Sequence, residues 1–372
     1  MIALTHTRTI STEVTELLED ISFPQKVHWL PDTYARVSTG LFYPPHRLAE
    51  KVLDPTLIQL LRDTPSKKTA FILAAGNAHF AGVPANPRNS RLSYQYKPLP
   101  LTLTQVYASR VAQACGASDH IVTDSTACAS SLKALMDVQT LLNFYGFTRV
   151  VVLSVEDAVS NLVLEFFGET KACLTAKREA EEGILPSAFD AKNGSFHVGQ
   201  GAVFAVFESG EGLSLSGFKP LAKLVGAYTA SEPCTNALGQ LDSGLGFVKA
   251  AQGAIEVAGI SANNIRIVKT HGTGTASNNV SERNALSQIL PDGFVATSYK
   301  PVIGHTMGAS GLLETALLVD SLREGTMPAI KNRTEDDRVF LSEPLPTPEG
   351  LVLSLAAGMG NVYSAAVLSV GA

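Results

Sequence analysis

The sequence predicts an α/β protein that is built from two similar halves. Short apolar or β-branched runs alternate with longer segments of helical periodicity, which is typical of a mainly parallel sheet covered by helices. The order of these runs is also roughly the same on the two sides of residues 208–212. We therefore expect an internal duplication, with one half at residues 1–208 and the other at residues 209–372.

The individual elements follow from the same patterns. In the first half, the predicted strands are 69–75, 121–123, 150–155 and 202–208, and the predicted helices are 103–115 and 128–145. In the second half, the predicted strands are 221–228, 265–270, 295–298, 351–356 and 364–370, and the predicted helices are 241–258, 280–290 and 308–322. Residues 82–101 and 157–201 have little regular pattern, and such long connections usually form a binding site or a subunit contact.

The composition narrows the class of protein. The 372 residues are 45% hydrophobic and 17% charged, which predicts a large folded core rather than a disordered chain. The net charge of -5 argues against nucleic acid as a partner. The N-terminus lacks a secretory signal pattern, and no long apolar run predicts a membrane span. The four cysteines form no CxxC pair, so we expect no disulfide framework, no metal site and a cytoplasmic location.

The densest functional signal is the segment DSTACASSL at residues 124–132. Cys128 lies where a short apolar run gives way to a long helical pattern, so it is predicted in or near the first turn of a helix. Unpaired N–H groups and the helix dipole favour a thiolate at such a position. The alternative is that Cys128 is an ordinary core residue, as we expect for Cys115, Cys173 and Cys234.

Two glycine-rich segments each place a histidine after a predicted strand. His271 lies in VKTHGTGT at 268–275, and His305 lies in SYKPVIGHTMGASG at 298–311. The carboxyl ends of parallel strands meet at one edge of a sheet, so both side chains can approach Cys128. GTGT lacks the spacing of a phosphate-binding loop, and its threonines suit hydrogen bonds to an extended polar ligand better. Each histidine by itself has the alternative of a structural role.

Two charged residues accompany His305. Lys300 precedes it by five residues, and Glu314 follows it by nine residues within the apolar run LLETALLVDSL. A carboxylate among leucines needs a partner if it is buried, and Lys300 is a candidate whose pairing could set the protonation of His305. The alternatives are an exposed helix position for Glu314 and a solvated surface lysine for Lys300.

Taken together, TACASSL at 126–132, KTHGTGT at 269–275 and KPVIGHTMGASGLLE at 300–314 resemble the elongating β-ketoacyl-acyl carrier protein synthases of the thiolase superfamily. The blocks occur in the family's order, and the resemblance runs from about residue 124 to the C-terminus. It implies a thiolase-like fold of duplicated αβαβα layers with two mixed five-stranded sheets. It also implies a dimer, formed with an identical or a related subunit, and an acyl carrier protein as partner.

The resemblance further implies a role for each candidate residue. Cys128 would take an acyl chain from the phosphopantetheine arm of the carrier, and malonyl-carrier would lose CO2 and attack the thioester. His271 and His305 would stabilise the enolate, with Lys300 and Glu314 supporting His305. The remaining implied groups are the N–H groups of Cys128 and Met359 in an oxyanion hole, Thr273 and Thr275 as pantetheine ligands, and Gly358 with Met359 in the C-terminal gate. The protein itself would need no cofactor and no metal ion.

The sequence departs from the family at three places. Asn278 and Asn279 stand where Gly-Asp usually follows HGTGT, and NGSFHVGQGA from Asn193 differs from the usual RDGFVxGEGA. Met359 occupies the place of a gating phenylalanine, so the acyl channel is predicted to differ, as in a specialised polyene or secondary-lipid synthase. Two rival functions remain: a synthase-like partner subunit that shapes the channel of an active chain, and a Cys–His hydrolase.

Overall fold

The computed structural model describes residues 1–11, 52–53, 55–76, 104–157, 167–170, 172–233, 236, 239–335 and 337–371. The irregular segment predicted at 82–101 and the core assignment of Cys234 lie outside these residues. Among the described helices, none is both long and apolar enough to cross a membrane.

The described strands form one ten-stranded mixed sheet and a separate two-stranded ribbon. In spatial order, the large sheet consists of β3 (His120–Asp124), β2 (Thr69–Ala74), β4 (Arg149–Asp157), β5 (Gln200–Ser209), β1 (Ile2–Ser11), β6 (Ala222–Ser231), β12 (Val362–Val370), β11 (Leu351–Gly358), β7 (Ile265–Lys269) and β8 (Val295–Thr297). The ribbon pairs β9 (Thr326–Met327) with β10 (Leu345–Pro346).

The sheet corrects the expectation of a mainly parallel arrangement. Only the outer pairs, β3–β2, β2–β4, β11–β7 and β7–β8, are parallel, whereas the five junctions between β4 and β11 are antiparallel. The implied two five-stranded sheets are recognisable on either side of the β1–β6 junction, which holds only three residue pairs. The fold is therefore the expected mixed, layered α/β fold.

Strand β1 is the main element that the sequence patterns missed. It pairs with β5 along its length and with β6 at its start, so it lies in the middle of the sheet. Only Ile2–Leu4 form an apolar run, and the following THTRTIS alternates threonine with charged, apolar or aromatic residues. A short apolar run does not mark a central strand, so its position depends on the partners that it finds in the folded protein.

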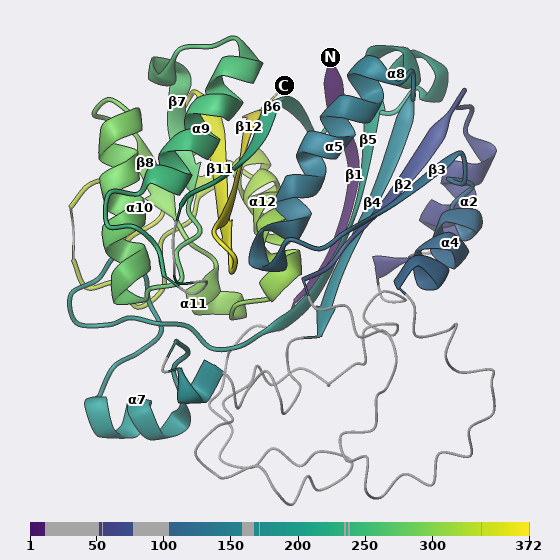
Figure 1. Cartoon of the computed structure of the whole chain (residues 1–372). Coiled ribbons are helices and arrows are strands. Elements are labelled where there is room, and N and C mark those ends of the chain that lie inside the picture. Colours follow the sequence, from purple (N-terminus) through teal and green to yellow (C-terminus); the bar gives the residue numbers. More distant parts are fainter. Residues whose placement is uncertain are drawn as a thin grey trace, which may run out of the picture.

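Helices separate the two parts of the sheet and cover their outer faces (Figure 1). The middle layer is made of α5 (Ser130–Phe144) and α12 (Ser310–Arg323), where the N–H of Leu312 donates to Ser131 Oγ at 3.0 Å. The outer helices are α2 (Pro55–Asp63) and α4 (Thr104–Ala114) on one side and α9 (Leu245–Ala258) and α10 (Ala276–Ile289) on the other. The shorter helices are α7 (Ala176–Glu182), α8 (Gly210–Ser216) and α11 (Lys300–Ile303).

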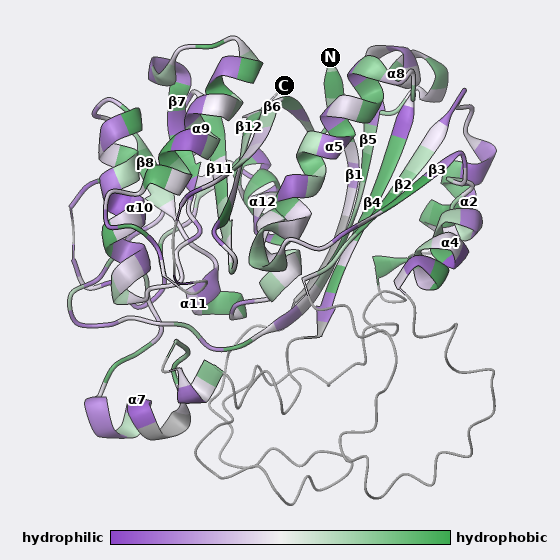
Figure 2. Ribbon diagram, viewed as in Figure 1, coloured by the Kyte–Doolittle hydropathy of each residue, from purple (hydrophilic) through white to green (hydrophobic). Residues whose placement is uncertain are grey.

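The apolar residues follow these layers (Figure 2). One core lies around α5 and α12, and separate cores lie under α2 with α4 and under α9 with α10. Strand β2 is buried throughout and β5 is buried except at its last residue. Burial on both faces explains why these strands read as continuous apolar runs rather than as alternating patterns.

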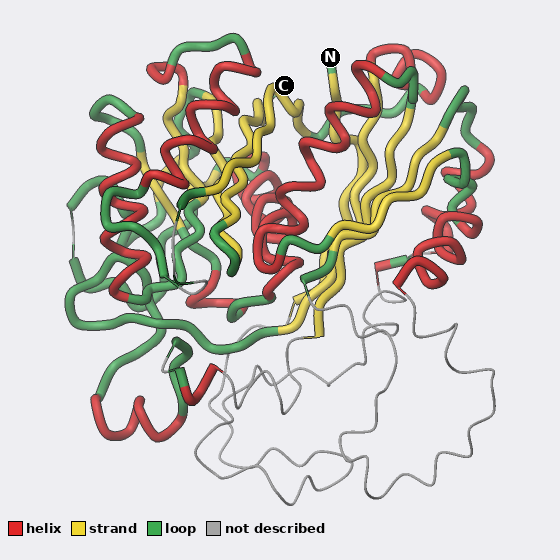
Figure 3. The backbone as a smooth tube through the Cα atoms, in the orientation of Figure 1, coloured by secondary structure: helices red, strands yellow, loops and turns green. Residues whose placement is uncertain are grey.

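The strand directions bring the candidate residues together. Strands β7, β8 and β11 are parallel to one another. Their ends and the end of β3 lie on the side of the molecule opposite the two termini, where loops gather (Figures 1 and 3). The loops that contain Cys128, His271, His305 and Met359 all follow these strand ends. This edge therefore holds the candidate site.

Candidate active site

Cys128 lies at the entry to the central helix α5. A 3-10 turn, η1 (Ala127–Ala129), connects β3 to the helix, and Ala127 opens the turn with a left-handed backbone at φ 49°. The thiol is buried against Phe167, Phe196 and Met307, and its sulfur lies 3.9 Å from the Met307 sulfur. The structure thus places Cys128 at the start of a helix, as the sequence predicted.

The expectation of a thiolate at this position is wrong for the free protein. Burial raises the pKa of the Cys128 thiol to about 12, because the site withholds water from the charged form. The positive charge of Lys300 and the backbone N–H groups of Met359 and Cys128 lower this pKa, but they do not offset the burial. Cys128 is therefore a neutral thiol at pH 7 that needs a base when it reacts.

We expect alkylation of Cys128 by iodoacetamide to be slow at pH 7 and to accelerate about tenfold per pH unit up to pH 9.5, because only the thiolate reacts. Peptide mapping by mass spectrometry gives the rate at each pH. Cys115, a buried thiol outside the pocket, is the control for general opening of the fold. A rate that reaches a plateau below pH 8 would contradict the neutral thiol.

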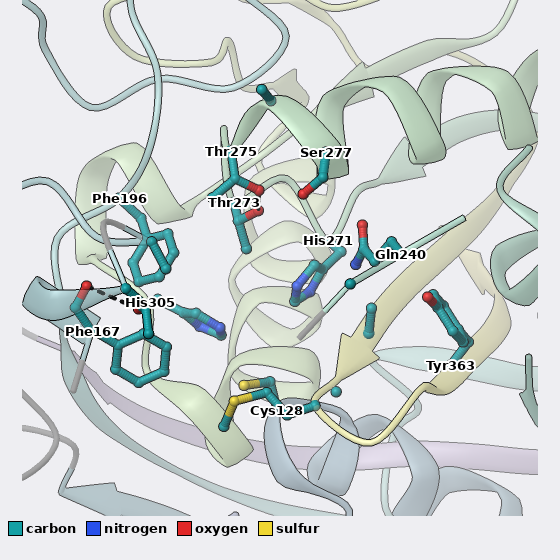
Figure 4. Close-up of a pocket in the computed structure, with 17 residues that line it drawn as sticks. Cys128, Phe167, Phe196, Gln240, His271, Thr273, Thr275, Ser277, His305 and Tyr363 are labelled. Carbon is teal, nitrogen blue, oxygen red and sulfur yellow. Dashed lines mark hydrogen bonds between the residues drawn. The ribbon is translucent and has the colours of Figure 1, made fainter. Parts of the chain in front are cut away.

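His271 and His305 face Cys128 from the second half of the chain (Figure 4). His271 follows β7, and His305 lies between α11 and a second 3-10 turn, η3 (Met307–Ala309). Both are buried, and their ring centres are 5.6 Å apart with an interplanar angle of 80°. Burial, followed by the charge of Lys300, lowers the pKa of each imidazole well below its usual value, so both rings are neutral at pH 7.

Lys300 and Glu314 form the predicted pair, with a distance of 2.8 Å between Nζ and Oε1. Both side chains are buried, so the exposed alternatives are excluded. Lys300 Nζ also donates to the carbonyl oxygen of His271 at 2.5 Å. Its contact is thus with the main chain of His271, while its effect on His305 is electrostatic.

A second buried lysine, which sequence reasoning missed, shares the same carboxylate. Lys269 Nζ lies 3.4 Å from Glu314 Oε2 and donates to the carbonyl oxygen of Leu355 at 2.7 Å. Burial lowers the pKa of Lys269 to about 8, although the charge of Glu314 opposes this shift. Lys269 reads as the end of an apolar strand, so nothing in its local sequence distinguishes it.

A buried carboxylate also holds the main chain of His271. Glu282 on α10 accepts hydrogen bonds from the N–H of His271 at 2.6 Å and of Gly272 at 2.9 Å. The Asn278 amide donates to the same carboxylate at 2.9 Å. Asn278 and Asn279, which depart from the usual Gly-Asp, thus keep a polar role, because Asn279 Oδ1 accepts from the N–H of Phe189 at 3.1 Å.

The unusual NGSFHVGQGA segment holds the main chain of His305. The N–H of His305 donates to the carbonyl oxygen of His197 at 2.7 Å, and the N–H of Gly199 donates to the His305 carbonyl at 2.9 Å. The Phe196 ring stands edge-on to the His305 ring, with centres 5.0 Å apart. His197 itself turns away and bonds to Glu179 of α7 at 3.0 Å. The sequence change from Val to His therefore leaves the backbone support of His305 in place.

The four residues predicted to bind substrate all line the same pocket as Cys128 and the two histidines. Thr273 and Thr275 stand on one wall, with their hydroxyls 3.2 Å apart. Gly358 is the last residue of β11, and Met359 opens the turn to β12. A Cβ atom at Gly358 would lie 2.5 Å from the carbonyl oxygen of Thr126, so glycine is required for this turn to approach Cys128.

The pocket wall has further side chains. Phe167, Thr170, Ala172 and Phe196 belong to the irregular segment 157–201, which was expected to form a binding site or a subunit contact. The others gave no signal in the sequence, and they are Gln240, Ala276, Ser277, Ala357 and Tyr363. Figure 4 shows Phe167 and Phe196 on one side of the cavity and the polar Thr273, Thr275, Ser277 and Gln240 on the other. The pocket thus offers an apolar wall and a polar wall to a ligand that reaches Cys128.

The turn that carries Cys128 has a counterpart in the second half. TACAS at 126–130 corresponds to TMGAS at 306–310, and Met307 opens η3 with φ 44°, close to the value of Ala127. The counterpart of Cys128 is Gly308, whose N–H donates to the Glu156 carboxylate at 3.2 Å. The turn in the second half therefore binds a carboxylate of the protein, whereas in the first half the N–H of Cys128 lowers the pKa of the thiol that lines the pocket.

Comparison with known proteins points to one family. The model of the N-terminal domain of beta-ketoacyl synthases matches residues 54–211, and the model of their C-terminal domain matches residues 221–334. Together the two matches cover more than half of the chain.

The individual relatives have low sequence identity to this chain. The chain is 28% identical over 271 residues to the putative polyketide beta-ketoacyl synthase 1 of Streptomyces halstedii, a match that covers 70% of this chain and 63% of that protein. It is 26% identical over 269 residues to 3-oxoacyl-acyl-carrier-protein synthase 2 of Vibrio cholerae, with coverages of 71% and 64%. The matched region thus spans less than two thirds of these relatives.

Two solved structures share the fold along the whole chain. One is a type II polyketide acyl carrier protein in complex with its ketosynthase, with a TM-score of 0.78, 17% identity, and coverage of 100% of this chain and 99% of that chain. The other is a beta-ketoacyl synthase from Burkholderia phymatum, with a TM-score of 0.79, 19% identity and the same coverages. At this identity the likeness concerns the fold.

Proposed function

The chain belongs to the beta-ketoacyl synthase family, and from this premise we propose that it catalyses the decarboxylative condensation of an acyl thioester with a malonyl thioester. Both substrates would be carried on the phosphopantetheine of an acyl carrier protein. The observation that carries the proposal is the pocket itself, in which Cys128, His271 and His305 meet. Relatives of this family act on fatty acid and polyketide chains.

In the first step, the Cys128 sulfur attacks the carbonyl carbon of the acyl-carrier thioester. A neutral imidazole beside the thiol accepts its proton and passes it to the departing carrier thiolate, so the exchange of one thioester for another is balanced. The N–H groups of Cys128 and Met359 lower the pKa of the Cys128 thiol, and their partial positive charge suits the oxyanion of the tetrahedral intermediate.

In the second step, malonyl-carrier occupies the pocket and loses CO2. The bond from the α-carbon to the carboxylate breaks, and the electron pair forms an enolate at the thioester. Ring N–H groups of the neutral His271 and His305 donate to the enolate oxygen. The α-carbon then attacks the acyl group on Cys128, and the sulfur leaves as a thiolate that regains a proton.

The polar wall of the pocket supports the delivery of substrates on a pantetheine arm. The hydroxyls of Thr273 and Thr275 suit the amide groups of such an arm, and the apolar wall with Phe167 and Phe196 suits an acyl chain. We propose an acyl carrier protein as partner and a dimer with an identical or a related subunit as the working assembly.

The alternative is a synthase-like partner subunit that only shapes the channel of an active chain. A subunit of that kind has no need of a nucleophile, whereas this chain keeps Cys128 in the same pocket as two neutral histidines. A Cys–His hydrolase leaves the second histidine and the buried Lys300–Glu314 pair without a role. The synthase is therefore the function that the geometry supports best.

The test is a reaction of the purified protein with a panel of acyl-carriers and malonyl-carrier. We expect an acyl mass on Cys128, CO2 release that depends on malonyl-carrier, and a product two carbons longer than the acyl donor. Acyl transfer without condensation would contradict the synthase. The absence of both the acyl mass and the CO2 release would overturn the proposed function if it persists when a co-purified partner subunit is added.

A further inference from the structure

Ser310 makes a contact with His305 that neither the sequence motifs nor the proposed roles include. Its Oγ lies 3.0 Å from Nδ1 of His305 and 3.1 Å from the hydroxyl of Thr306. All three side chains are buried, with exposed fractions of 2% or less. Bulk water therefore does not compete for these hydrogen bonds.

The matching turn in the first half also has a serine, but that serine makes different hydrogen bonds. The counterpart of Ser310 is Ser130, whose Oγ accepts from the N–H of Thr126 at 2.8 Å and donates to the carbonyl oxygen of Ala127 at 2.6 Å. Ser130 thus closes its own turn by main-chain contacts. In the described part of the chain, Ser310 Oγ bonds instead to the side chains of His305 and Thr306.

The role of the Ser310–His305 contact depends on which ring nitrogen of His305 carries the hydrogen. A neutral imidazole has one N–H, and the other ring nitrogen is an acceptor. An enolate oxygen in the pocket needs a ring nitrogen that donates. If Nε2 carries the hydrogen, Nδ1 must accept, and a serine hydroxyl can donate to it while accepting from the threonine hydroxyl. The chain of donors then runs from Thr306 through Ser310 and His305 to the ligand.

We propose that Ser310 is a positioning residue that donates its hydroxyl hydrogen to Nδ1 of His305 and so holds the imidazole as the tautomer with hydrogen on Nε2. The inference rests on the proposed function for its consequence in catalysis, but the tautomer itself is a property of the free protein. Without the hydroxyl, hydrogen on Nδ1 leaves Nε2 bare, and a bare nitrogen repels the enolate oxygen.

The test compares Ser310→Ala with Ser310→Thr and with Ser364→Ala. Thr keeps a hydroxyl at the position. Ser364 is the matched control, because it is equally buried and bonds to the hydroxyl of Thr229 at 3.0 Å, away from the pocket. We expect Ser310→Ala to slow malonyl-dependent CO2 release roughly 10- to 100-fold through kcat rather than KM. Ser310→Thr should recover most of the rate, and loading of Cys128 should change little.

The decisive readout is the tautomer, which needs no activity. In long-range proton–nitrogen correlation spectra of protein with ring-15N histidine, assigned with His305→Gln, wild type should carry hydrogen on Nε2 of His305. Ser310→Ala should show a shift toward Nδ1, and Ser364→Ala should show none. Hydrogen on Nδ1 in wild type, or identical spectra of wild type and Ser310→Ala, would overturn the inference. An inactive wild type with the expected spectra would overturn the proposed function and leave the role of Ser310 supported.

Discussion

Replacing Cys128 with Ala is expected to lower formation of the elongated product by a factor on the order of 10³ or more, because no covalent acyl intermediate can form. Release of CO2 from malonyl-carrier should persist, since the enolate forms beside His271 and His305 and does not require the sulfur. The variant should then yield acetyl-carrier in place of the condensation product, with a proton from water taking the place of the acyl group.

Cys115→Ala is the control for this change. Both thiols are buried, both substitutions remove one sulfur atom, and Cys115 belongs to the core under α2 and α4, outside the pocket. The control should keep its acyl mass and its condensation rate. An acyl adduct on Cys128→Ala, or an unchanged product yield, would show that Cys128 is not the nucleophile.

Replacing Glu314 with Gln is expected to lower the free energy of unfolding at pH 7 by about 3–5 kcal/mol, the usual cost of leaving a buried charge without its partner. Glu314 is the carboxylate between Lys269 and Lys300, and all three side chains are at most 1% exposed. The variant leaves two buried ammonium groups facing a neutral amide. Urea unfolding followed by circular dichroism measures the loss.

The loss should depend on pH in a definite direction. The pKa of Lys269 in the folded protein is about 8, below its ordinary value of 10.5, and the variant should lower it further. The charge of Glu314 stabilises the protonated form of Lys269 in wild type. At pH 9 Lys269 is mostly neutral in both proteins, so this stabilisation no longer separates them. The deficit of Glu314→Gln should therefore shrink at pH 9.

Glu324→Gln is the matched control, because Glu324 follows the last residue of the same helix and is exposed. It should change the free energy of unfolding by less than about 0.5 kcal/mol. A loss below about 1 kcal/mol for Glu314→Gln, or a loss independent of pH, would show that the lysines are not held as two buried charges.

Much of the candidate site was predictable because its residues stand in local patterns. Cys128 follows a strand and opens a helix, and His271 and His305 each follow a strand in glycine-rich sequence, so the sequence predicted that they gather where strands end, and all three line one pocket. The pairing of Lys300 with Glu314 followed from the rule that a carboxylate within an apolar helix needs a partner. The division of the chain near residue 208 stays a prediction.

Other parts of the site have no local signature. Glu156 is the residue before the end of β4, yet it accepts a hydrogen bond from the N–H of Gly308, which is 152 residues away. Lys269 and Ser310 look like ordinary residues of their segments, and their roles come from Glu314 and His305 beside them. Strand β1 has only a short apolar run, and its central place depends on β5 and β6.

The sequence by itself determined the α/β class and the family, and it supplied the three side chains that are proposed to react, because these depend on residue type and on spacing along the chain. Only the tertiary structure decided the order of the strands in the sheet, the neutral Cys128 thiol, the two lysines on Glu314 and the hydroxyl on His305. The physical reason is that pKa values and hydrogen bonds depend on the exclusion of water and on the few ångströms between side chains. Both are set by the packing of segments that lie far apart in the sequence.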